Sequence, residues 1–579
     1  MAIIDNLAKQ NSEQWLLSEA IDQQTKDFII DLIKNNIEQF NESFYRNLEF
    51  GTGGLRGIMG IGTNRMNQYT VSMATQGFVN YIIKCNPNKQ IKAVISFDSR
   101  NKSEEFALIT AKVMAANGFK VFLFNELRPT PVLSYAVRQL KCDAGVMITA
   151  SHNPKEYNGY KAYWNDGGQL VYPHDTLVIE EVVKIKDFSQ VKSNGNENNI
   201  TIVDSSFDKL YLNEVLKLSL SPKTIEKHSN IKICYTPLHG TGITMVPKAL
   251  EMYGFKNISI VKEQAVLDGD FPTCKSPNPE EHSAMELGMK LAKEIDADVL
   301  LATDPDADRV GIAVKDNNNE FVLINGNQTA TVLTYYILKI LKETDRLKGN
   351  EYTIKTIVTS ELIRKVSESF GVKNYDVFTG FKFIAEKILE LESKEKYICG
   401  GEESYGFSIG DYVRDKDAVS ACCLIAEVCA WAKEQGKSFF DILLGIYLEY
   451  GFFKEELLSI TIKGKSGAEQ IQKMMADFRH NPPKTIIGLE VVMIKDYQKQ
   501  TTLDTITLKE EILGFPKSNV LQFFLKDGSK ISIRPSGTEP KIKFYFGVFN
   551  QLNSIKEYPE LEKKAEAKIQ KIISELGLK

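Results

Sequence analysis

The sequence predicts an α/β protein of several domains that ends in a smaller α+β domain. The chain has 579 residues, which is too many for one compact core and suggests about three to four domains. Strand and helix patterns alternate regularly in its first third, as in a mainly parallel sheet that is covered by helices. The last part instead combines short β-rich runs with one terminal helix, which is typical of an α+β domain.

The first segment, residues 1–205, carries the clearest alternation. We expect strands at Lys92–Phe97, Val121–Phe124 and Ala144–Ile148. We expect an amphipathic helix at Ser103–Ala116. Gly118 follows the helix, where a helix terminator belongs. The polar run KSNGNENN at 192–199 predicts an exposed loop. A helical pattern at 207–217 then places the first domain boundary near residue 205.

The second and third segments, 206–325 and 326–454, continue the α/β pattern. A βα unit opens at Ile231, and a strand at 298–303 leads into an acidic loop. The third segment begins with a helix at 328–341, and its expected strands lie around Thr356–Thr359 and at Lys396–Ile398.

The fourth segment, 455–579, has a different texture. Its β-rich runs lie at 457–464 and 530–549, and its terminal helix is expected at Pro559–Leu576. We see no low-complexity tract and no short-period repeat. Three similar α/β units would form a long-period repeat, but identity between the segments is too faint to show one.

Composition argues against several kinds of partner. The net charge of −4 offers no general attraction to nucleic acid or to an anionic membrane, so we expect neither as a partner. The start, MAIIDNLAKQ, lacks a signal-peptide pattern, and no segment is apolar enough to cross a bilayer. The eight cysteines form no C-x-x-C pair. These features predict a cytoplasmic enzyme with reduced thiols.

Ser151 is the candidate nucleophile. It lies in TASHNP, Thr149–Pro154, directly after the expected strand Ala144–Ile148. Ligands of α/β proteins bind at the carboxyl ends of strands, and a serine hydroxyl there can carry a phosphoryl group. The same residues also suit a plain turn that only shapes the backbone. The neighbouring motifs favour the functional interpretation.

The candidate metal ligands are Asp304, Asp306 and Asp308, which alternate in DPDADR between two apolar strands. In a strand-like loop alternate side chains point to one side, so we expect the three carboxylates to converge. They would repel one another without a cation, and oxygen ligands without His or Cys favour Mg²⁺. The bound ion would lie against the oxygens of a phosphorylated Ser151, as phosphoryl transfer requires.

A phosphatase of the haloacid-dehalogenase class is an alternative, because its motif also begins with an aspartate after a strand. In that class the first aspartate is the nucleophile and the motif continues as D-x-[TV]. Here position 307 is Ala and position 308 is Asp, so this alternative fits less well.

Two arginines are candidate ligands of the transferring phosphoryl group. One is Arg309, which ends the acidic motif, and the other is Arg56 in the glycine-rich segment GTGGLRG at 51–57. The planar guanidinium matches phosphate geometry, and the glycines let backbone approach an anion closely.

Two further loops suit substrate binding. Glu402 and Ser404 combine an acceptor with a hydroxyl, which suits adjacent sugar hydroxyls. RPSGTEPK at 534–541 lies between two expected strands and combines an arginine, hydroxyls and a glycine amide. We assign an untransferred phosphate to this second loop, with Lys541 or Lys543 adding charge to the main candidates Arg534, Ser536, Gly537 and Thr538.

These motif sets, in this order from residue 51 to residue 541, resemble the α-D-phosphohexomutases of the phosphoglucomutase/phosphomannomutase family. The likeness is closest to the phosphoglucomutase branch. It implies a four-domain, heart-shaped protein in which three α/β mixed-sheet domains and a C-terminal α+β domain surround a central cleft. It also implies a monomer or weak dimer that acts on sugar monophosphates.

The resemblance further implies residue roles. Ser151 would be phosphorylated, Mg²⁺ would be the cofactor, and glucose 1,6-bisphosphate would be activator and intermediate. His152, Lys161 and Lys416 match family positions implicated in proton transfer, and their division into acid and base stays open. Lys382, in TGFK at 379–382, matches a family loop near the distal part of the sugar site.

The expected reaction is the interconversion of glucose 1-phosphate and glucose 6-phosphate. The Glu-Glu-Ser sequence at 402–404 favours glucose over mannose. The segments 51–57 and 159–164 resemble the branch that includes phosphopentomutases and glucose 1,6-bisphosphate synthases, so these activities stay alternatives beside phosphomannomutase. From other classes, a phosphatase or a non-catalytic sugar-phosphate sensor is also considered.

Overall fold

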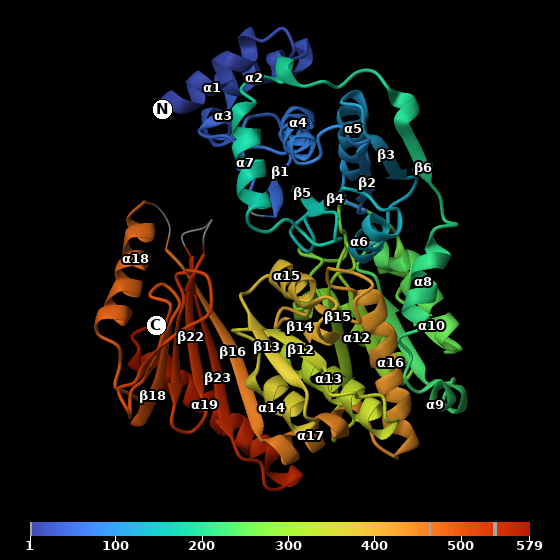
Figure 1. Cartoon of the computed structure of the whole chain (residues 1–579), viewed down its shortest axis with the longest axis vertical. Helices are drawn as coiled ribbons and strands as arrows, with labels where there is room; N and C mark the ends of the chain where they lie inside the picture. The colour runs from blue at the N-terminus through green and yellow to red at the C-terminus, as the bar shows by residue number, and fades with distance from the viewer. Residues whose placement is uncertain (1–2, 52, 463–464, 537–540, 579) are drawn as a thin grey trace. The chain divides into compact units, whose positions relative to one another are not determined.

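The computed structural model describes residues 3–51, 53–462, 465–536 and 541–578, and within these ranges the strands form four sheets (Figure 1). The chain divides into two compact units. The first unit combines Met1–Thr356 with Val372–Phe440 and holds three of the described sheets. The second combines Ile357–Gly371 with Asp441–Lys579 and holds the fourth.

A small helical layer precedes the first sheet. It consists of α1 (Asn6–Leu17), α2 (Gln23–Asn35) and α3 (Ile37–Phe44). Each helix begins where an Asp or Asn side chain accepts a hydrogen bond from a first-turn N–H, at Asp5, Asp22 and Asn36. Trp15, Phe40 and Phe44 pack together with Tyr69 of the following helix.

The first sheet has the strand order β1-β5-β4-β2-β3-β6. Its strands are β1 (Gly54–Ile58), β2 (Lys92–Phe97), β3 (Lys120–Phe124), β4 (Ala144–Ile148), β5 (Tyr157–Trp164) and β6 (Ile200–Val203). The pairs β2–β3, β2–β4 and β3–β6 are parallel, whereas β5 is antiparallel to both of its neighbours. Its helices are α4 (Gln68–Cys85), α5 (Ser103–Ala116), α6 (Thr130–Gln139) and α7 (His174–Lys184), with short 3₁₀ turns η1 (Phe188–Gln190) and η2 (Glu197–Asn199).

The elements predicted for this sheet are confirmed. β2, α5 and β4 have the predicted bounds, and β3 begins one residue earlier than predicted, at Lys120. Gly118 has a φ of +88°, the left-handed conformation that a glycine after a helix supplies without steric cost. Parallel pairing places the carboxyl ends of β2 and β4 at the same edge of the sheet, and Ser151 follows β4 there.

The second sheet has the order β11-β10-β9-β7-β8. It is formed by β7 (Lys232–Thr236), β8 (Asn257–Ile260), β9 (Val299–Thr303), β10 (Val310–Lys315) and β11 (Phe321–Ile324). Around it lie α8 (Asp208–Leu216), α9 (Pro222–Lys227), η3 (Thr241–Thr244), α10 (Val246–Tyr253), α11 (Lys262–Ala265) and α12 (His282–Glu294). β9 and β10 are antiparallel neighbours, so the acidic loop is the turn that connects them.

The third sheet has the order β13-β12-β14-β15. It is formed by β12 (Glu351–Thr356), β13 (Lys373–Val377), β14 (Lys396–Gly401) and β15 (Phe407–Ile409), with the helices α13 (Gly326–Glu343), α15 (Phe381–Leu391) and α16 (Ala418–Glu434). The strand predicted around Thr356–Thr359 is wrong in position, because β12 ends at Thr356 and the chain turns there. The β-branched residues of that stretch misplace the strand, since residue preference does not report where pairing ends.

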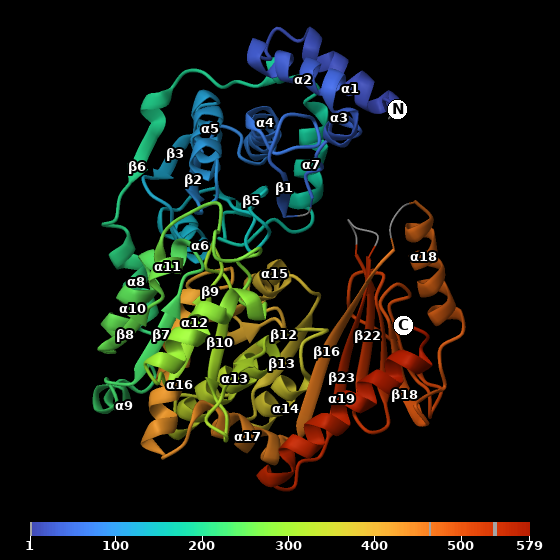
Figure 2. The same ribbon diagram turned by 180° about the vertical axis from the view of Figure 1, so that it is seen from behind.

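The second unit contains an antiparallel sheet of order β16-β23-β22-β21-β18-β19-β20, with β17 paired to β18. Figure 2 labels the strands β16, β18, β22 and β23 of this sheet. Its strands are β16 (Phe452–Thr461), β17 (Thr485–Ile486), β18 (Leu489–Asp496), β19 (Thr501–Asp504), β20 (Glu510–Ile512), β21 (Leu521–Leu525), β22 (Lys530–Pro535) and β23 (Lys541–Asn550). Its helices are α14 (Glu361–Ser369), α17 (Phe439–Tyr450), which begins two residues before the unit, α18 (Lys465–His480), η4 (Ile555–Glu557) and α19 (Tyr558–Glu575). The helix α19 lies along β23 and β16.

The predicted fold class is confirmed, with mixed sheets in the first three parts of the chain and a β-rich C-terminal part. The boundaries near 205, 325 and 454 stay predictions, and β16 spans the last of them. Among the described residues, no helix has both the length and the apolar character needed to span a bilayer.

Candidate active site

Ser151 is the first residue of interest beyond β4. It is 3% exposed and adopts a left-handed backbone with a φ of +52°. Its N–H donates to Oγ1 of Thr149 at 2.8 Å, and its hydroxyl donates to Oδ2 of Asp304 at 2.6 Å. The structure therefore brings together two loops that were predicted separately and that belong to different sheets. One is the serine loop, residues 151–157, and the other is the acidic loop, residues 304–309.

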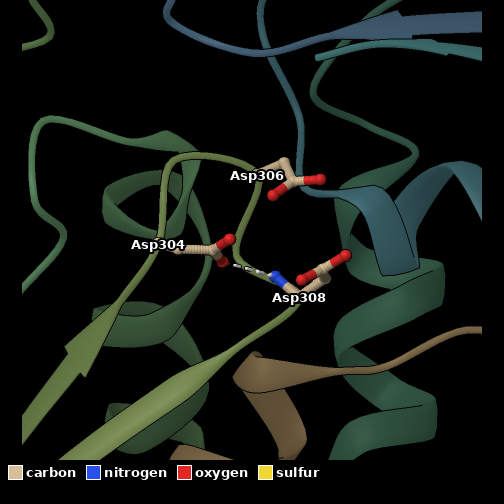
Figure 3. A group of neighbouring side chains, drawn as sticks. All are labelled: Asp304, Asp306 and Asp308. Carbon is tan, nitrogen blue, oxygen red and sulfur yellow. Dashed lines mark hydrogen bonds between the residues drawn. The ribbon is translucent and has the colours of Figure 1, made fainter. Parts of the chain in front are cut away.

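The acidic loop brings its three carboxylates together (Figure 3). Asp304, Asp306 and Asp308 are buried, and one carboxylate oxygen of each lies within 4.8 Å of the others. The expected strand-like conformation is wrong, because the segment is a turn in which Ala307 has a φ of +48°. Oδ1 of Asp304 accepts from the N–H groups of Asp308 and Arg309, at 3.1 and 3.0 Å, and these bonds fold the turn back on itself.

The donor set fits a hard divalent cation. Oδ1 of Asp306 and Oδ1 of Asp308 are buried without a hydrogen-bond partner, which is costly for a carboxylate unless a cation fills the space. Burial and the charges of Asp306 and Asp308 raise the pKa of Asp304 well above its usual range. An all-oxygen set that repels itself and leaves acceptors unused is what Mg²⁺ would satisfy.

Two lysines hold the acidic loop from other elements. Lys161 of β5 donates to Oδ2 of Asp306 at 2.6 Å and to Oδ2 of Asp308 at 3.0 Å. Lys416 lies 3.0 Å from the same oxygen of Asp308 and donates to Asp415 at 2.9 Å. Burial opposes the charge of both lysines, yet the neighbouring carboxylates outweigh it and raise the pKa of each. Both are therefore charged at neutral pH.

His152 lies beside the serine hydroxyl. Its Nδ1 is 3.2 Å from Oγ of Ser151, and its carbonyl accepts from the Ser276 hydroxyl at 2.7 Å. Burial, and then the charges of Arg309 and Arg56, lower the pKa of His152 well below its usual value. The imidazole is therefore neutral at physiological pH and can accept a proton.

The two predicted arginines are held differently. Arg309 donates from Nη1 to Oε1 of Glu280 at 2.7 Å, so this guanidinium is already directed by an ion pair. Arg56, on β1 opposite Gly159, is exposed and makes no hydrogen bond or ion pair with the rest of the described chain. A guanidinium that has no partner of its own among the described residues and lies near the three aspartates is well suited to an anionic ligand.

The predicted sugar-binding loop, residues 402–406, connects β14 to β15. Its backbone is hydrogen-bonded to the acidic loop. Arg309 and Gly406 form an antiparallel bridge, and Val310 donates to the Tyr405 carbonyl at 3.0 Å. Gly406 is required here, because an added Cβ would lie 2.1 Å from Cδ of Lys416. The glycine thus leaves room for the Lys416 side chain to reach Asp308.

Glu402 is the buried acceptor of this loop. It is 5% exposed and its Oε1 accepts from the Gly380 N–H at 2.8 Å. Burial raises the pKa of Glu402 to about 7. Ser404 is half-buried two residues later. Lys382, in the first turn of α15, is half-buried and forms an ion pair with Asp175 at 3.3 Å.

The predicted phosphate loop lies in the second unit. Arg534 of β22 is opposite Lys543 of β23, and both side chains are half-buried. The Ser536 N–H donates to the Lys541 carbonyl at 2.7 Å, which closes the strand pair. Gly537 and Thr538, the other predicted ligands, lie outside the described residues.

Several residues of this site escape sequence reasoning. Arg100 donates to the carbonyls of the serine loop, and Thr130 donates from its hydroxyl to Oδ2 of Asp306 at 2.8 Å. Asp415 accepts from the side chains of Tyr163, Gln169 and Lys416 at 2.7 to 2.9 Å. Arg100 and Thr130 follow β2 and β3, so polar residues just beyond the ends of parallel strands were the available signal.

Comparison with known families gives three consecutive matches along the chain. Models of phosphoglucomutase/phosphomannomutase alpha/beta/alpha domains I, II and III match residues 47–189, 209–318 and 325–450. Each matched range contains strands of one of the sheets described above, in the same order along the chain.

Whole-chain relatives agree with these matches. The chain is 38% identical over 541 residues to the phosphoglucomutase of Staphylococcus aureus strain MRSA252, covering 93% of this chain and 96% of the relative. It is 36% identical over 512 residues to the phosphoglucomutase of Staphylococcus haemolyticus, covering 88% of this chain and 91% of the relative.

Solved structures share the fold at lower identity. A phosphoglucomutase/phosphomannomutase family protein from Burkholderia thailandensis superimposes with a TM-score of 0.64 at 15% identity, covering 91% of this chain and 97% of the other. Parafusin, a phosphoglucomutase from Paramecium in its open form, gives 0.64 at 18% identity, covering 91% and 96%. The chain belongs to the phosphoglucomutase/phosphomannomutase family and is a mutase of the α-D-phosphohexomutase superfamily.

Proposed function

We propose that this mutase is a phosphoglucomutase, which interconverts α-D-glucose 1-phosphate and glucose 6-phosphate through phosphorylated Ser151 and glucose 1,6-bisphosphate. The observation that carries the proposal is the 2.6 Å hydrogen bond from the Ser151 hydroxyl to Asp304, within a buried cluster of three aspartates. A nucleophile beside a cation site is what reversible phosphoryl transfer needs. Relatives named phosphoglucomutase support the choice of glucose.

Asp304, Asp306 and Asp308 would hold Mg²⁺ together with an oxygen of the phosphorylated Ser151. When bound, the ion supplies positive charge against the phosphoryl oxygens. Arg56 is free to contact the same oxygens, and Arg309 can do so from its ion pair with Glu280. Lys161 and Lys416 hold the carboxylates in place and add charge at the centre.

The reaction consists of two transfers. The 6-hydroxyl of glucose 1-phosphate attacks the phosphorus on Ser151, so that the bond from phosphorus to Oγ breaks and a bond to O6 forms. The hydroxyl proton passes to the neutral imidazole of His152, and Oγ of Ser151 takes up a proton from the charged Lys161 or Lys416, the other proton-transfer candidates around the Ser151–Asp304 contact. The bisphosphate then turns over, and its 1-phosphoryl group returns to Ser151, leaving glucose 6-phosphate.

Substrate recognition falls to two loops. Glu402 and Ser404 would contact sugar hydroxyls. Lys382, which matches a family loop near the distal part of the sugar site, would lie near the far end of the sugar. Arg534, Ser536, Gly537, Thr538 and Lys543 would hold the phosphate that is not being transferred. The cytoplasmic location and the monomeric or weakly dimeric state stay predictions.

The first experiment is turnover of glucose 1-phosphate, ribose 1-phosphate and mannose 1-phosphate with Mg²⁺ and catalytic glucose 1,6-bisphosphate, while free phosphate is monitored. We expect glucose to be preferred, with almost no phosphate released. A preference for ribose would keep the mechanism and reassign the protein as a phosphopentomutase, which the segments 51–57 and 159–164 also resemble. Phosphate release without isomerisation would identify a phosphatase instead.

A further inference from the structure

Arg100 is a buried cation, and the hydrogen bonds and ion pair of its described side chain do not reach the carboxylates of Asp304, Asp306 or Asp308. It follows β2 in the segment Asp98–Ser103 and is 3% exposed. From Nη1 it donates to the carbonyls of Pro154 and Tyr157, at 2.9 and 3.0 Å. From Nη2 it donates to the carbonyls of Ser151 and Asn153. One guanidinium thus binds four carbonyls of the loop that carries the nucleophile.

The Ser151 backbone needs such support. Its φ of +52° is a left-handed conformation, which costs a residue with a Cβ about 1 to 2 kcal/mol. A strained residue keeps its conformation only where surrounding contacts over-determine it. Thr149 binds the Ser151 N–H and Arg100 binds its carbonyl, so both peptide groups that flank the Ser151 Cα are held. The direction of the side chain follows from these two constraints.

Arg100 is itself held on several sides. Asp98 pairs with its Nε at 3.3 Å and accepts its backbone N–H at 3.0 Å. The Ser103 hydroxyl donates to the same carboxylate at 2.7 Å and accepts from Asn158 at 3.0 Å, which lies at the far end of the serine loop. Phe271, from the second sheet's segment, lies 5.0 Å below the guanidinium. The Arg100 guanidinium is therefore held in one orientation before any substrate binds.

We infer that Arg100 is the positioning residue of the phosphoryl-transfer step, and that Asp98 keeps Arg100 in place. Arg100 fixes the backbone of Ser151–Tyr157 so that Oγ of Ser151 points at Asp304. The inference rests on the proposed function of Ser151 as the phosphoryl carrier.

This role has a specific kinetic signature. Both transfers pass through Ser151, so misorientation of Oγ lowers kcat in each direction, whereas substrate affinity is set by residues elsewhere. We therefore expect kcat to fall while the KM for the sugar phosphate stays within about threefold. A lysine can donate to these carbonyls but lacks the planar fork, so it cannot hold all of them.

The test compares Arg100→Lys with Arg479→Lys in the full chain. Arg479 is another largely buried arginine, bonded to Asp496 and Asn519 in the second unit and absent from the predicted site. For Arg100→Lys we expect a kcat about 100-fold lower, the order lost when reacting groups are misplaced by about 1 Å. We expect faster amide hydrogen exchange at residues 149–157, and a folded protein by thermal unfolding. Arg479→Lys should leave kcat and this exchange unchanged.

If Arg100→Lys does not fold, Asp98→Asn supplies the same test, because it keeps the shape and removes the charge that pairs with Nε of Arg100. An expected loss of about tenfold in kcat, again without a change in KM, supports the inference. Wild-type kcat in a folded Arg100→Lys or Asp98→Asn protein, or unchanged exchange at 149–157, overturns it. Hydrogen exchange needs no substrate, so it shows whether Arg100 holds the backbone of 149–157 even if the wild-type protein isomerises none of the sugars, and it separates that outcome from failure of the proposed function.

Discussion

The serine–aspartate site and the Arg534 loop differ in how their backbones are held. Ser151 and the three aspartates are buried and are bonded by side chains from several other elements, including Thr130, Lys161 and Lys416. Arg534 and Lys543 instead face each other on one pair of antiparallel strands and are half-buried. A group that forms and breaks bonds needs one fixed geometry, whereas a phosphate clamp works largely through charge.

This contrast predicts that substitutions in the first site lower kcat and that substitutions in the second raise KM. The largest effect is expected for Ser151→Ala, which removes the phosphoryl carrier. We expect isomerisation to fall by at least about 10⁴-fold, as when an essential nucleophile is removed, with the thermal unfolding temperature little changed. The measurement is a coupled assay of glucose 6-phosphate formation, with the exposed Ser205→Ala as the matched serine control. Turnover near the wild-type rate would contradict the phosphoserine mechanism.

The next effect concerns the acidic turn. Asp306→Asn keeps the shape but removes one charge from the cluster, so we expect Mg²⁺ affinity to fall by about 10- to 100-fold and kcat to fall with it. Calorimetric titration of Mg²⁺ measures the affinity without turnover. The control is Asp345→Asn, whose side chain is fully exposed and remote from the acidic turn in sequence. Equal Mg²⁺ affinities for the wild type and Asp306→Asn would refute a metal site here.

For the second site we expect a different pattern. In the proposed mechanism Arg534→Gln removes a charge-assisted contact to the untransferred phosphate, worth about 2 to 3 kcal/mol, so KM should rise by about 30- to 160-fold. Phosphorylation of Ser151 by glucose 1,6-bisphosphate at saturating concentration, followed by mass spectrometry, should reach the wild-type level. Lys526→Gln, an exposed change in the same unit, should leave KM unchanged. A lower kcat at constant KM in Arg534→Gln would contradict the predicted difference between the two sites.

A smaller effect is expected from pH. Glu402 has a pKa of about 7, so it is mostly protonated at pH 6 and mostly ionised at pH 8. An ionised carboxylate accepts a hydrogen bond from a sugar hydroxyl more strongly than a neutral carboxyl group does, so substrate affinity should increase as pH rises through 7, by about tenfold if the carboxylate form alone binds. Because sugar phosphates also titrate, the informative quantity is the ratio of wild-type KM to Glu402→Gln KM across pH. A ratio that does not change with pH would contradict this assignment.

The last effect concerns the stability of the second unit and not its contribution to activity. Burial raises the pKa of Glu455 from 4.5 to about 7, and its Oε1 has no hydrogen-bond partner among the described atoms. The folded state therefore binds the proton more tightly than the unfolded state, so stability falls as pH rises from about 4.5 to 7 and stays lower above it. The full shift corresponds to at most about 3 kcal/mol. Glu455→Gln should raise the unfolding temperature at pH 8 more than at pH 5, and an equal change at both would count against it.

Much of the fold was predictable because local patterns determine it. The bounds predicted for β2, α5 and β4 are confirmed, since each is a strongly apolar or amphipathic run flanked by polar residues. The strand near Thr356–Thr359 was misplaced, because where a strand stops depends on its pairing partners. The acidic side chains converge as expected but on a turn with a left-handed Ala307, which alternation alone does not predict.

The sequence by itself determined the α/β class, the order of the motifs and the chemical types at the site, because these depend on residues close together along the chain. Tertiary structure decided which residues meet. Ser151 bonds Asp304 across 153 residues, Thr130 bonds Asp306 across 176, and Arg100 bonds the serine loop across more than 50. Such contacts leave no local pattern, since they arise only when strands from different parts of the chain end at neighbouring positions.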